Sequence, residues 1–127
     1  MTTNILTWDE GYDERELHSP TPDDVTGRIA ALDGVDHTLV TVYRNDAHLA
    51  VGGSANEGLV VYCTFDSEVF WQVVVDGDPG ASVTLVAGGQ AGAYPATHVT
   101  TLGDAITAAV DFLERGERAP GLHWDAQ

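Results

Sequence analysis

The sequence contains no lysine and only five arginines, against 20 aspartates and glutamates. Its formal net charge is −15. A phosphate backbone or an anionic membrane surface is bound through a basic patch that displaces counterions, and five scattered arginines do not form one. The composition therefore argues against nucleic-acid and membrane partners and favours a basic protein partner. A chain from a high-GC or high-salt source would show the same acid enrichment, so both explanations stand.

Cysteine and long hydrophobic runs are also scarce. The single cysteine, Cys63, has no partner for an internal disulfide and excludes a zinc site built from several cysteines. No apolar run approaches the roughly 20 residues that span a bilayer. Residues 1–10 lack the basic and apolar regions of a signal peptide. We therefore expect a soluble, cytoplasmic protein.

The familiar catalytic and cofactor motifs are missing as well. None of the histidines follows another at helical metal-ligand spacing; they are His18, His37, His48, His98 and His123. Residues 88–92 read GGQAG, and no helix follows directly to present its N-terminus to a phosphate. Cys63 lies within an apolar run, where a small buried hydrophobe is expected. We expect no catalytic residue, no metal and no cofactor.

The pattern that is present indicates a compact fold of both helices and strands. The 127 residues suffice for one domain, 1–127, with a substantial core. Thr21 and Pro22 predict a helix start, and Gly34 its end. Thr101 predicts a second helix, with Asp104 completing a capping box and Gly116 following the last turn.

Between the two helices the apolar residues recur with a period of two. Strands are predicted over 37–44, 47–53, 58–65, 69–76 and 82–87, and a further strand is predicted before the first helix, over 3–8. The connections are too short for crossover helices, so neighbouring strands pair antiparallel. Residues 9–18 are predicted to be irregular, and 88–95 to form a glycine-rich loop. The predicted fold class is α+β, a single antiparallel meander sheet of about five to six strands packed with two helices.

The strand predicted over 69–76 has two different faces. Val69, Trp71, Val73 and Val75 alternate on one side and are expected to face the core. The other side carries Gln72 and Asp76 and is expected to be the wetter one. Near the C-terminus, Trp124 is expected to fold back onto the core, because its exposure would forfeit about 2–3 kcal/mol of burial.

The last third of the chain resembles a known family. Residues 88–124 run GGQAGAYPATHVTTLGDAITAAVDFLERGERAPGLHW. A Gly-Gly loop, a proline, a threonine-capped helix and a near-terminal tryptophan follow one another as in the Imm1 family of bacterial immunity proteins. The segment is similar to the inhibitors of double-stranded-DNA cytosine deaminase toxins. The matching residues Ala108, Ala109, Phe112 and Trp124 are interpreted as packing residues.

This resemblance implies a non-enzymatic α+β protein whose partner is the catalytic domain of a toxin encoded beside it. A toxin that acts on nucleic acid needs a basic groove, and a protein of charge −15 would be steered onto that groove. Exposed acidic, aromatic and amide residues are therefore the candidates for toxin binding. They are Glu57, Tyr62, Asp66, Glu68, Gln72, Asp76 and Asp78, with Thr64 and the acidic segment 9–16 as further candidates.

Two other functions remain open at this point. One is a small-molecule-binding or enzymatic domain with a pocket between sheet and helices, lined by Cys63, a histidine and a carboxylate. The other is a regulatory protein-interaction module unrelated to toxins.

Overall fold

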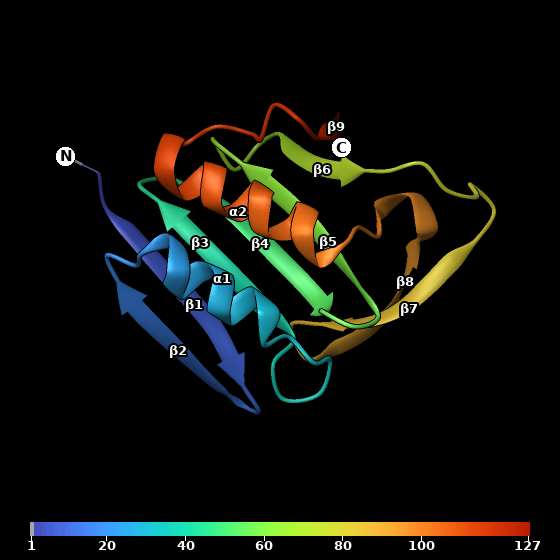
Figure 1. Cartoon of the computed structure of the whole chain (residues 1–127), viewed down its shortest axis with the longest axis horizontal. Coiled ribbons are helices and arrows are strands. Elements are labelled where there is room, and N and C mark those ends of the chain that lie inside the picture. The colour runs from blue at the N-terminus through green and yellow to red at the C-terminus, as the bar shows by residue number, and fades with distance from the viewer. Residues whose placement is uncertain (1) are drawn as a thin grey trace.

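One large antiparallel sheet carries both helices on one face and leaves the other face without a helix (Figure 1). The computed structural model describes residues 2–127. The helices are α1 (Pro22–Ala30) and α2 (Leu102–Arg115), and a short 3-10 helix, η1 (Ala96–His98), precedes α2. Within residues 2–127, neither α-helix is long and apolar enough to cross a membrane.

The main sheet has seven strands in the order β2-β1-β3-β4-β5-β6-β9. Their bounds are β1 (Asn4–Glu10), β2 (Asp13–His18), β3 (Leu39–Arg44), β4 (Ala47–Ser54), β5 (Gly58–Thr64), β6 (Phe70–Val74) and β9 (His123–Ala126). A separate two-stranded sheet is formed by β7 (Ser82–Ala87) and β8 (Gln90–Pro95). The α+β class, the antiparallel pairing and the two helices are confirmed. The single sheet of five to six strands is wrong.

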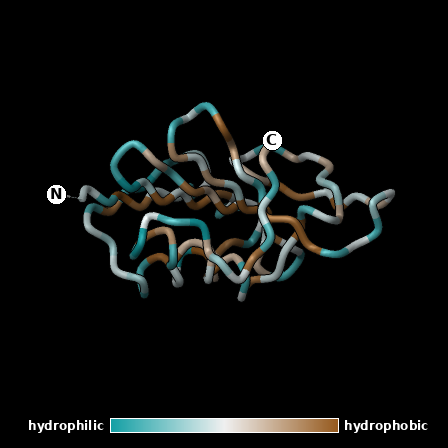
Figure 2. Tube along the Cα trace, turned by 90° about the horizontal axis from the view of Figure 1, so that it is seen from above, coloured by the Kyte–Doolittle hydropathy of each residue, from teal (hydrophilic) through white to brown (hydrophobic). Residues whose placement is uncertain are grey.

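The core lies between the sheet and the helices, and strand alternation decides which residues enter it. Leu6 pairs with Val42, Val42 with Leu49, and Leu49 with Cys63, so one row of side chains points toward the helices. All four are fully buried. Figure 2 shows the hydrophobic segments gathered in the middle of the molecule and the hydrophilic ones at the outer turns. The neighbouring residues on each strand point to the opposite, open face.

Two strands of the main sheet, β2 and β9, were missed because they carry no hydrophobic alternation. The irregular segment predicted over 9–18 is instead the end of β1 followed by β2, all of whose residues are exposed. β2 lies at the sheet edge, and charged side chains on an edge strand discourage pairing with another chain. β9 is a short edge strand that pairs with β6. Both strands are held by backbone hydrogen bonds to their neighbours, and this pairing requires no alternation of polar and apolar side chains.

The hairpin of β7 and β8 corrects two further predictions. Residues 88–95 are a turn and a strand, and only Gly88 and Gly89, at φ of 64° and 78°, form the loop. Two consecutive positive φ values suit a tight hairpin turn. The strand predicted over 82–87 exists but lies outside the main sheet. Ala87 packs so closely on Gly52 that a Cβ at Gly52 would collide with it, which fixes the hairpin against β4.

The helix starts follow the local capping chemistry. Thr21 and Asp24 form a complete capping box at α1, whereas the box predicted for α2 is half formed. There Thr101 accepts from the Asp104 backbone, but the Asp104 carboxylate accepts from the Thr100 hydroxyl. Gly116 ends α2 at a φ of 67°, as predicted. α1 ends at Ala30, earlier than the predicted Gly34.

Two tryptophans close the end of the core near the C-terminus. Trp124 on β9 is half-buried against the core, and its indole N–H donates to the Ala119 carbonyl at 3.1 Å. This fold-back was predicted. Trp71 points to the helix side as predicted but is only half-buried, and Arg118 stacks on its ring at 3.8 Å.

Candidate functional site

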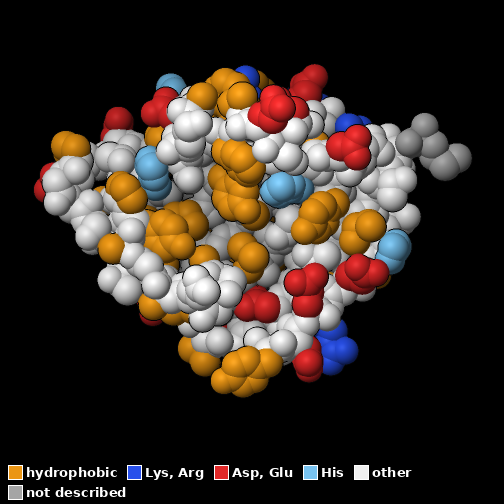
Figure 3. Space-filling view, turned by 180° about the vertical axis from the view of Figure 1, so that it is seen from behind, with side chains coloured by type: hydrophobic (Ala, Val, Ile, Leu, Met, Phe, Trp, Pro, Cys, Tyr) orange, Lys and Arg blue, Asp and Glu red, His pale blue; other side chains and the backbone are white. Residues whose placement is uncertain are grey.

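Four aromatic rings form a cluster on the open face of the sheet, which we call the aromatic patch: Tyr43, His48, Tyr62 and Phe70. They come from β3, β4, β5 and β6, and neighbouring ring centroids lie 5.7 to 6.5 Å apart. Tyr43 is 40% exposed, and the other three are half-buried. Figure 3 shows hydrophobic side chains spread across the centre of this face. An exposed apolar patch of this kind marks an interaction surface.

The aromatic patch is buried enough to shift the pKa values of its own titratable groups. Burial lowers the pKa of His48, which favours the neutral imidazole. Burial also raises the pKa of Tyr62, with a smaller contribution from Tyr43. Beside the patch, the Gln72 side chain donates to the Val61 carbonyl at 2.8 Å. At neutral pH the patch therefore presents uncharged rings with polar edges, the composition enriched in the cores of protein interfaces.

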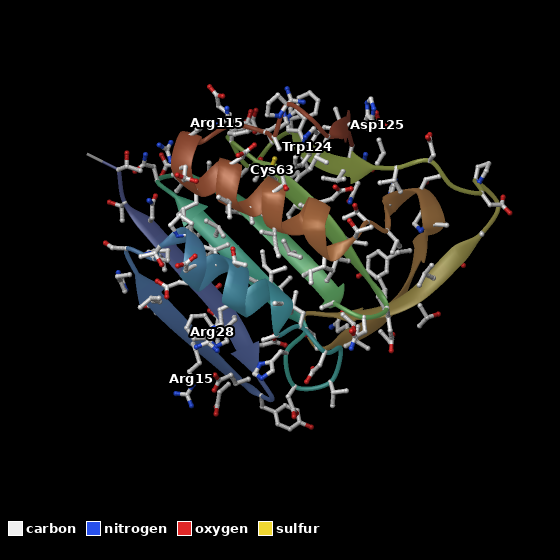
Figure 4. The ribbon with its side chains drawn as sticks, in the orientation of Figure 1. Arg15, Arg28, Cys63, Arg115, Trp124 and Asp125 are labelled. Atoms are coloured by element: carbon white, nitrogen blue, oxygen red, sulfur yellow. The ribbon has the colours of Figure 1, made fainter. Side chains whose placement is uncertain are left out.

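All five arginines of the described chain contact the helix side or its edges. Arg28 stacks on Trp8 at 3.8 Å, and Arg118 stacks on Trp71. Arg15 donates to Glu10 at 3.2 Å, and the Arg44 guanidinium lies against Gly116 at the end of α2. Arg115 pairs with Asp111 within α2. Figure 4 shows Arg15 and Arg28 beside β1 and β2, and Arg115 at the end of α2.

The open face is left without arginine as a result. Seen from that side, cationic side chains appear only at the rim (Figure 3). Carboxylates remain at and around the face, including Asp46 in the turn between β3 and β4 and Asp125 on β9. The net charge of −15 is thus distributed unevenly, with the compensating cations on the helix side. The open face combines rings with negative potential, which suits a basic protein surface.

A groove of about 720 Å³ continues from the aromatic patch toward the hairpin, and we call it the acidic groove. Its lining includes Asp9, Tyr12, Glu14, Asp36, Tyr43 and Gly89. Tyr43 belongs to both the groove and the patch, so the two surfaces are continuous. Tyr12 stands fully exposed at the turn between β1 and β2. The groove therefore joins acidic side chains to an unburied aromatic ring.

Asp9 holds the walls of the acidic groove together. Its carboxylate accepts from the backbone N–H groups of Thr38 and Leu39, at 2.7 and 2.9 Å, and from the Thr38 hydroxyl. The Thr38 hydroxyl also accepts from the Gly89 N–H at 2.9 Å. Asp9 on β1 is thereby linked through Thr38 to the tip of the hairpin. This chain of hydrogen bonds is structural and fixes the groove's shape.

The structure gives little support to the alternative functions that require catalysis. Cys63 is fully buried in the core, and burial raises the pKa of its thiol to about 12, so the thiolate that a nucleophile requires is absent at neutral pH. Across residues 2–127, no three histidine, cysteine, aspartate or glutamate side chains gather as a metal site. The site that the fold presents is a surface for binding.

The comparison with protein families agrees with this geometry. The family model described as "Immunity protein Imm1" matches residues 13–126, nearly the whole chain. The chain belongs to the Imm1 family of immunity proteins. No curated protein and no solved structure matches it. Membership indicates a toxin-inhibiting immunity protein whose partner is a protein, the toxin.

The structure brings together only part of the predicted toxin-binding set. Tyr62 and Gln72 are paired neighbours on β5 and β6 and lie together on the open face. Asp66 and Glu68 lie in the loop between β5 and β6, at one end of the sheet. The three remaining candidates lie toward the other end: Glu57 in the turn between β4 and β5, and Asp76 and Asp78 after β6. The seven candidates therefore do not form one contiguous site.

Three of the candidates also have structural roles in this immunity protein. The Asp66 carboxylate accepts from the backbone N–H groups of Val69 and Glu68, which lower its pKa. Asp78 accepts from the Gly80 N–H at 2.8 Å and stabilises a turn. Thr64, a further candidate, is fully buried and binds the Val69 carbonyl through its hydroxyl. Asp66 and Asp78 remain exposed, whereas Thr64 is not available to a partner.

Sequence reasoning missed three residues of the surface, Tyr43, His48 and Phe70, and included Tyr12 only as part of the acidic segment 9–16. Tyr43 and His48 lie on either side of the turn between β3 and β4, which sets them opposite each other. Phe70 lies on the strand and face of Gln72, and extending the two-face analysis to the neighbouring strands would have found Tyr43 and His48. Tyr12 lies in a segment that was predicted to be irregular, so no face could be assigned to it.

Proposed function

We propose that this immunity protein inhibits its toxin by placing the open face of its sheet over the mouth of the toxin's active site. The toxin is an enzyme that acts on nucleic acid, a cytosine deaminase, encoded beside the immunity protein. The encounter takes place in the cytoplasm of the producing cell. The inhibitor performs no chemistry; it occupies the path that the nucleic acid would take.

The observation that carries this proposal is the separation of charge and aromatic surface on the two faces. The open face offers the aromatic patch and no arginine, whereas the arginines contact the helix side. An enzyme that binds nucleic acid surrounds its active site with lysine and arginine to hold phosphates. The open face complements such a surface in charge, and its rings supply the apolar anchors that carry most interface energy.

The magnitudes fit a tight inhibitor. Protection of a cell requires a dissociation constant of about nanomolar or below, about −12 kcal/mol. An interface of about 1,600 Å² in total, with a few buried aromatic anchors, reaches this range. Opposite charges accelerate the encounter to about 10⁸–10⁹ M⁻¹s⁻¹ at low salt. The proposal therefore predicts an association rate that falls steeply as salt is raised.

The first test is co-expression with the polypeptide encoded next door, followed by purification of the complex. We expect the immunity protein to rescue growth, to co-purify with the toxin domain and to abolish deamination of double-stranded DNA by it. Rescue without direct binding, or an association rate that salt does not change, contradicts the blocking mechanism. Rescue from a toxin that leaves DNA bases intact contradicts the deaminase assignment.

A matched pair of variants locates the binding face. Tyr43 and Phe65 are aromatic residues of nearly equal exposure, 40% and 38%, on opposite faces of the sheet. Phe65 lies on the helix side, with its ring 6.1 Å from Phe112. We expect Tyr43→Ala to weaken toxin binding by about 30-fold, equivalent to about 2 kcal/mol, and Phe65→Ala to leave it within about twofold. The opposite order would assign binding to the helix side.

A further inference from the structure

We propose that the acidic groove seats an extended, arginine-bearing segment of the toxin, with the guanidinium groups held between carboxylates and tyrosine rings. This inference rests on the proposed function for the identity of the partner. It adds the chemistry that the groove recognises and separates the groove from the aromatic patch. The argument comes from the groove's shape, from the state of its charged groups and from the arginines elsewhere in the fold.

The groove is a channel whose floor and two walls are formed by defined parts of the fold. Asp9 and Tyr43, from the open faces of β1 and β3, lie on its floor. The tip of the hairpin at Gly89 forms one wall, tied to the floor through Thr38. The turn between β1 and β2, with Tyr12, forms the other wall. A volume of about 720 Å³ accommodates several side chains, and its fixed walls reduce the entropy lost on binding.

The groove's carboxylates differ in how far they are already occupied. Asp9 is fully engaged by N–H and hydroxyl donors of Thr38 and Leu39. In the described chain, the side chains of Glu14 and Asp36 form neither a hydrogen bond nor an ion pair, and both residues are exposed. Arg15, next to Glu14 on β2, pairs with Glu10 on the other face. With Asp13, which also lines the groove and has no side-chain partner among residues 2–127, three carboxylates thus remain available to a cation from outside the chain.

The same fold shows what such a set of groups binds. On the helix side, Trp8, Glu10 and Arg28 form a cluster in which the guanidinium stacks on the indole at 3.8 Å and lies 3.9 Å from the carboxylate. The acidic groove contains the matching aromatic and acidic components, Tyr12 and Glu14, with no arginine lining it. An arginine from the partner would complete the cluster.

Charge and geometry decide between possible occupants. A second copy of this chain carries a charge of −15, and its repulsion from the groove disfavours self-association. A phosphate or nucleic acid is excluded by the same sign of charge. Arginine is preferred over lysine because its planar guanidinium stacks on a ring and binds a carboxylate through two hydrogen bonds at once. The occupant is therefore an arginine-bearing peptide segment.

The test uses the full-length protein and a tetra-arginine amide peptide, followed by NMR titration and calorimetry. We expect the largest chemical-shift changes at Tyr12, Glu14, Asp36 and Gly89. The double variant E14Q/D36N removes two negative charges at the groove, and the matched double variant E114Q/E117Q removes two negative charges at the end of α2. We expect about fivefold weaker peptide binding for the groove pair and less than twofold change for the control pair.

Equal weakening by both pairs, or shifts spread over the helix side, would show attraction to net charge alone and would overturn the inference. A tetra-lysine peptide that binds as tightly as tetra-arginine would overturn the role of the tyrosine rings. Tyr12→Ala tests the same role without risk to folding, because Tyr12 is fully exposed. It is expected to weaken tetra-arginine binding about threefold and to leave tetra-lysine binding nearly unchanged.

Failure of this inference is distinguishable from failure of the proposed function. If E14Q/D36N binds the co-purified toxin as tightly as the unmodified chain while Tyr43→Ala does not, the groove is not a seat and the open-face mechanism stands. If both groove and patch variants retain full inhibition, the open face itself is not the binding surface.

Discussion

The two faces of the main sheet differ in what covers them and in where the charges are satisfied. On the helix side, α1 and α2 bury Leu6, Leu49 and Phe112 completely, and four of the five arginines stack on a ring or pair with a carboxylate. On the open face, the aromatic patch is left half-exposed, and within residues 2–127 the groove's Glu14 and Asp36 carboxylates have no side-chain partner. Most side chains on the helix side find their packing and pairing partners within the chain. The open face has the composition of a surface that a second protein completes.

This contrast also separates stability from binding. The helix side holds nearly all the large buried apolar side chains, so its residues determine whether the chain folds. The open face contributes fewer buried atoms, and its residues are free to be selected for a partner. Variants on the two sides should therefore change different measurements.

The largest expected effect is a loss of stability on the helix side. Phe112→Ala removes a fully buried ring from α2 and leaves a cavity beneath it, which costs about 3–5 kcal/mol. Urea unfolding followed by tryptophan fluorescence measures this loss. Tyr43→Ala on the open face serves as the control and should cost less than about 1 kcal/mol, because that ring is 40% exposed. Comparable losses would contradict the division of roles.

The sequence predicted the elements whose signals are local. Both helix starts were found because Thr21 and Thr101 cap through their own side chains, and strands β3 to β6 were found from the alternation of apolar residues. β2 and β9 were missed because edge strands held by backbone pairing need no apolar face. The separation of the hairpin from the main sheet depends on the contact of Ala87 with Gly52, which is distant in sequence.

The same limit applies to the candidate site. Tyr62 and Gln72 were predicted because each strand face can be inferred from its own residues. The aromatic patch depends on registers across four strands, and the acidic groove depends on the docking of a hairpin through Thr38. Neither is encoded in any one segment. The family resemblance, by contrast, was recognised from residues 88–124 alone, because it depends on the order of elements and not on their contacts.

A smaller effect is expected where the open face depends on Asp9. Thr38→Val removes the hydroxyl that joins Asp9 to Gly89 while keeping the side chain's volume. We expect a loss of about 1–2 kcal/mol, because the Asp9 carboxylate loses a donor in a partly buried site. Faster amide exchange at residues 87–90, with unchanged exchange in α2, would locate the loss at the hairpin. A uniform change over both regions would show that Thr38 stabilises the whole fold instead.

The smallest effect is a dependence on pH that belongs to the open face. Burial lowers the pKa of His48, whereas an unfolded histidine titrates near about 6.5. Between the two values the unfolded chain binds more protons, so the contribution of neutral His48 is fully present above about pH 6.5 and is lost as the pH falls from there through the lowered pKa of folded His48. We expect His48→Gln to flatten the stability curve between pH 7 and pH 5.5. An unchanged slope of stability against pH would show that burial does not shift the titration of the His48 imidazole.

Toxin binding should sharpen this pH dependence, because a partner on the aromatic patch buries His48 further. Affinity for the toxin should therefore fall as the pH is lowered through 6, and the fall should be smaller in the His48→Gln variant. An equal fall in both proteins would assign the pH dependence to groups of the toxin.

The most direct measurement is hydroxyl-radical footprinting of the immunity protein with and without its toxin, read by mass spectrometry at aromatic side chains on both faces. The account predicts that oxidation of Tyr12, Tyr43 and Phe70 falls sharply in the complex, while oxidation of Phe65 and Trp124 is unchanged. Protection of Phe65 and Trp124, with Tyr43 and Phe70 still oxidised at the free rate, would contradict it.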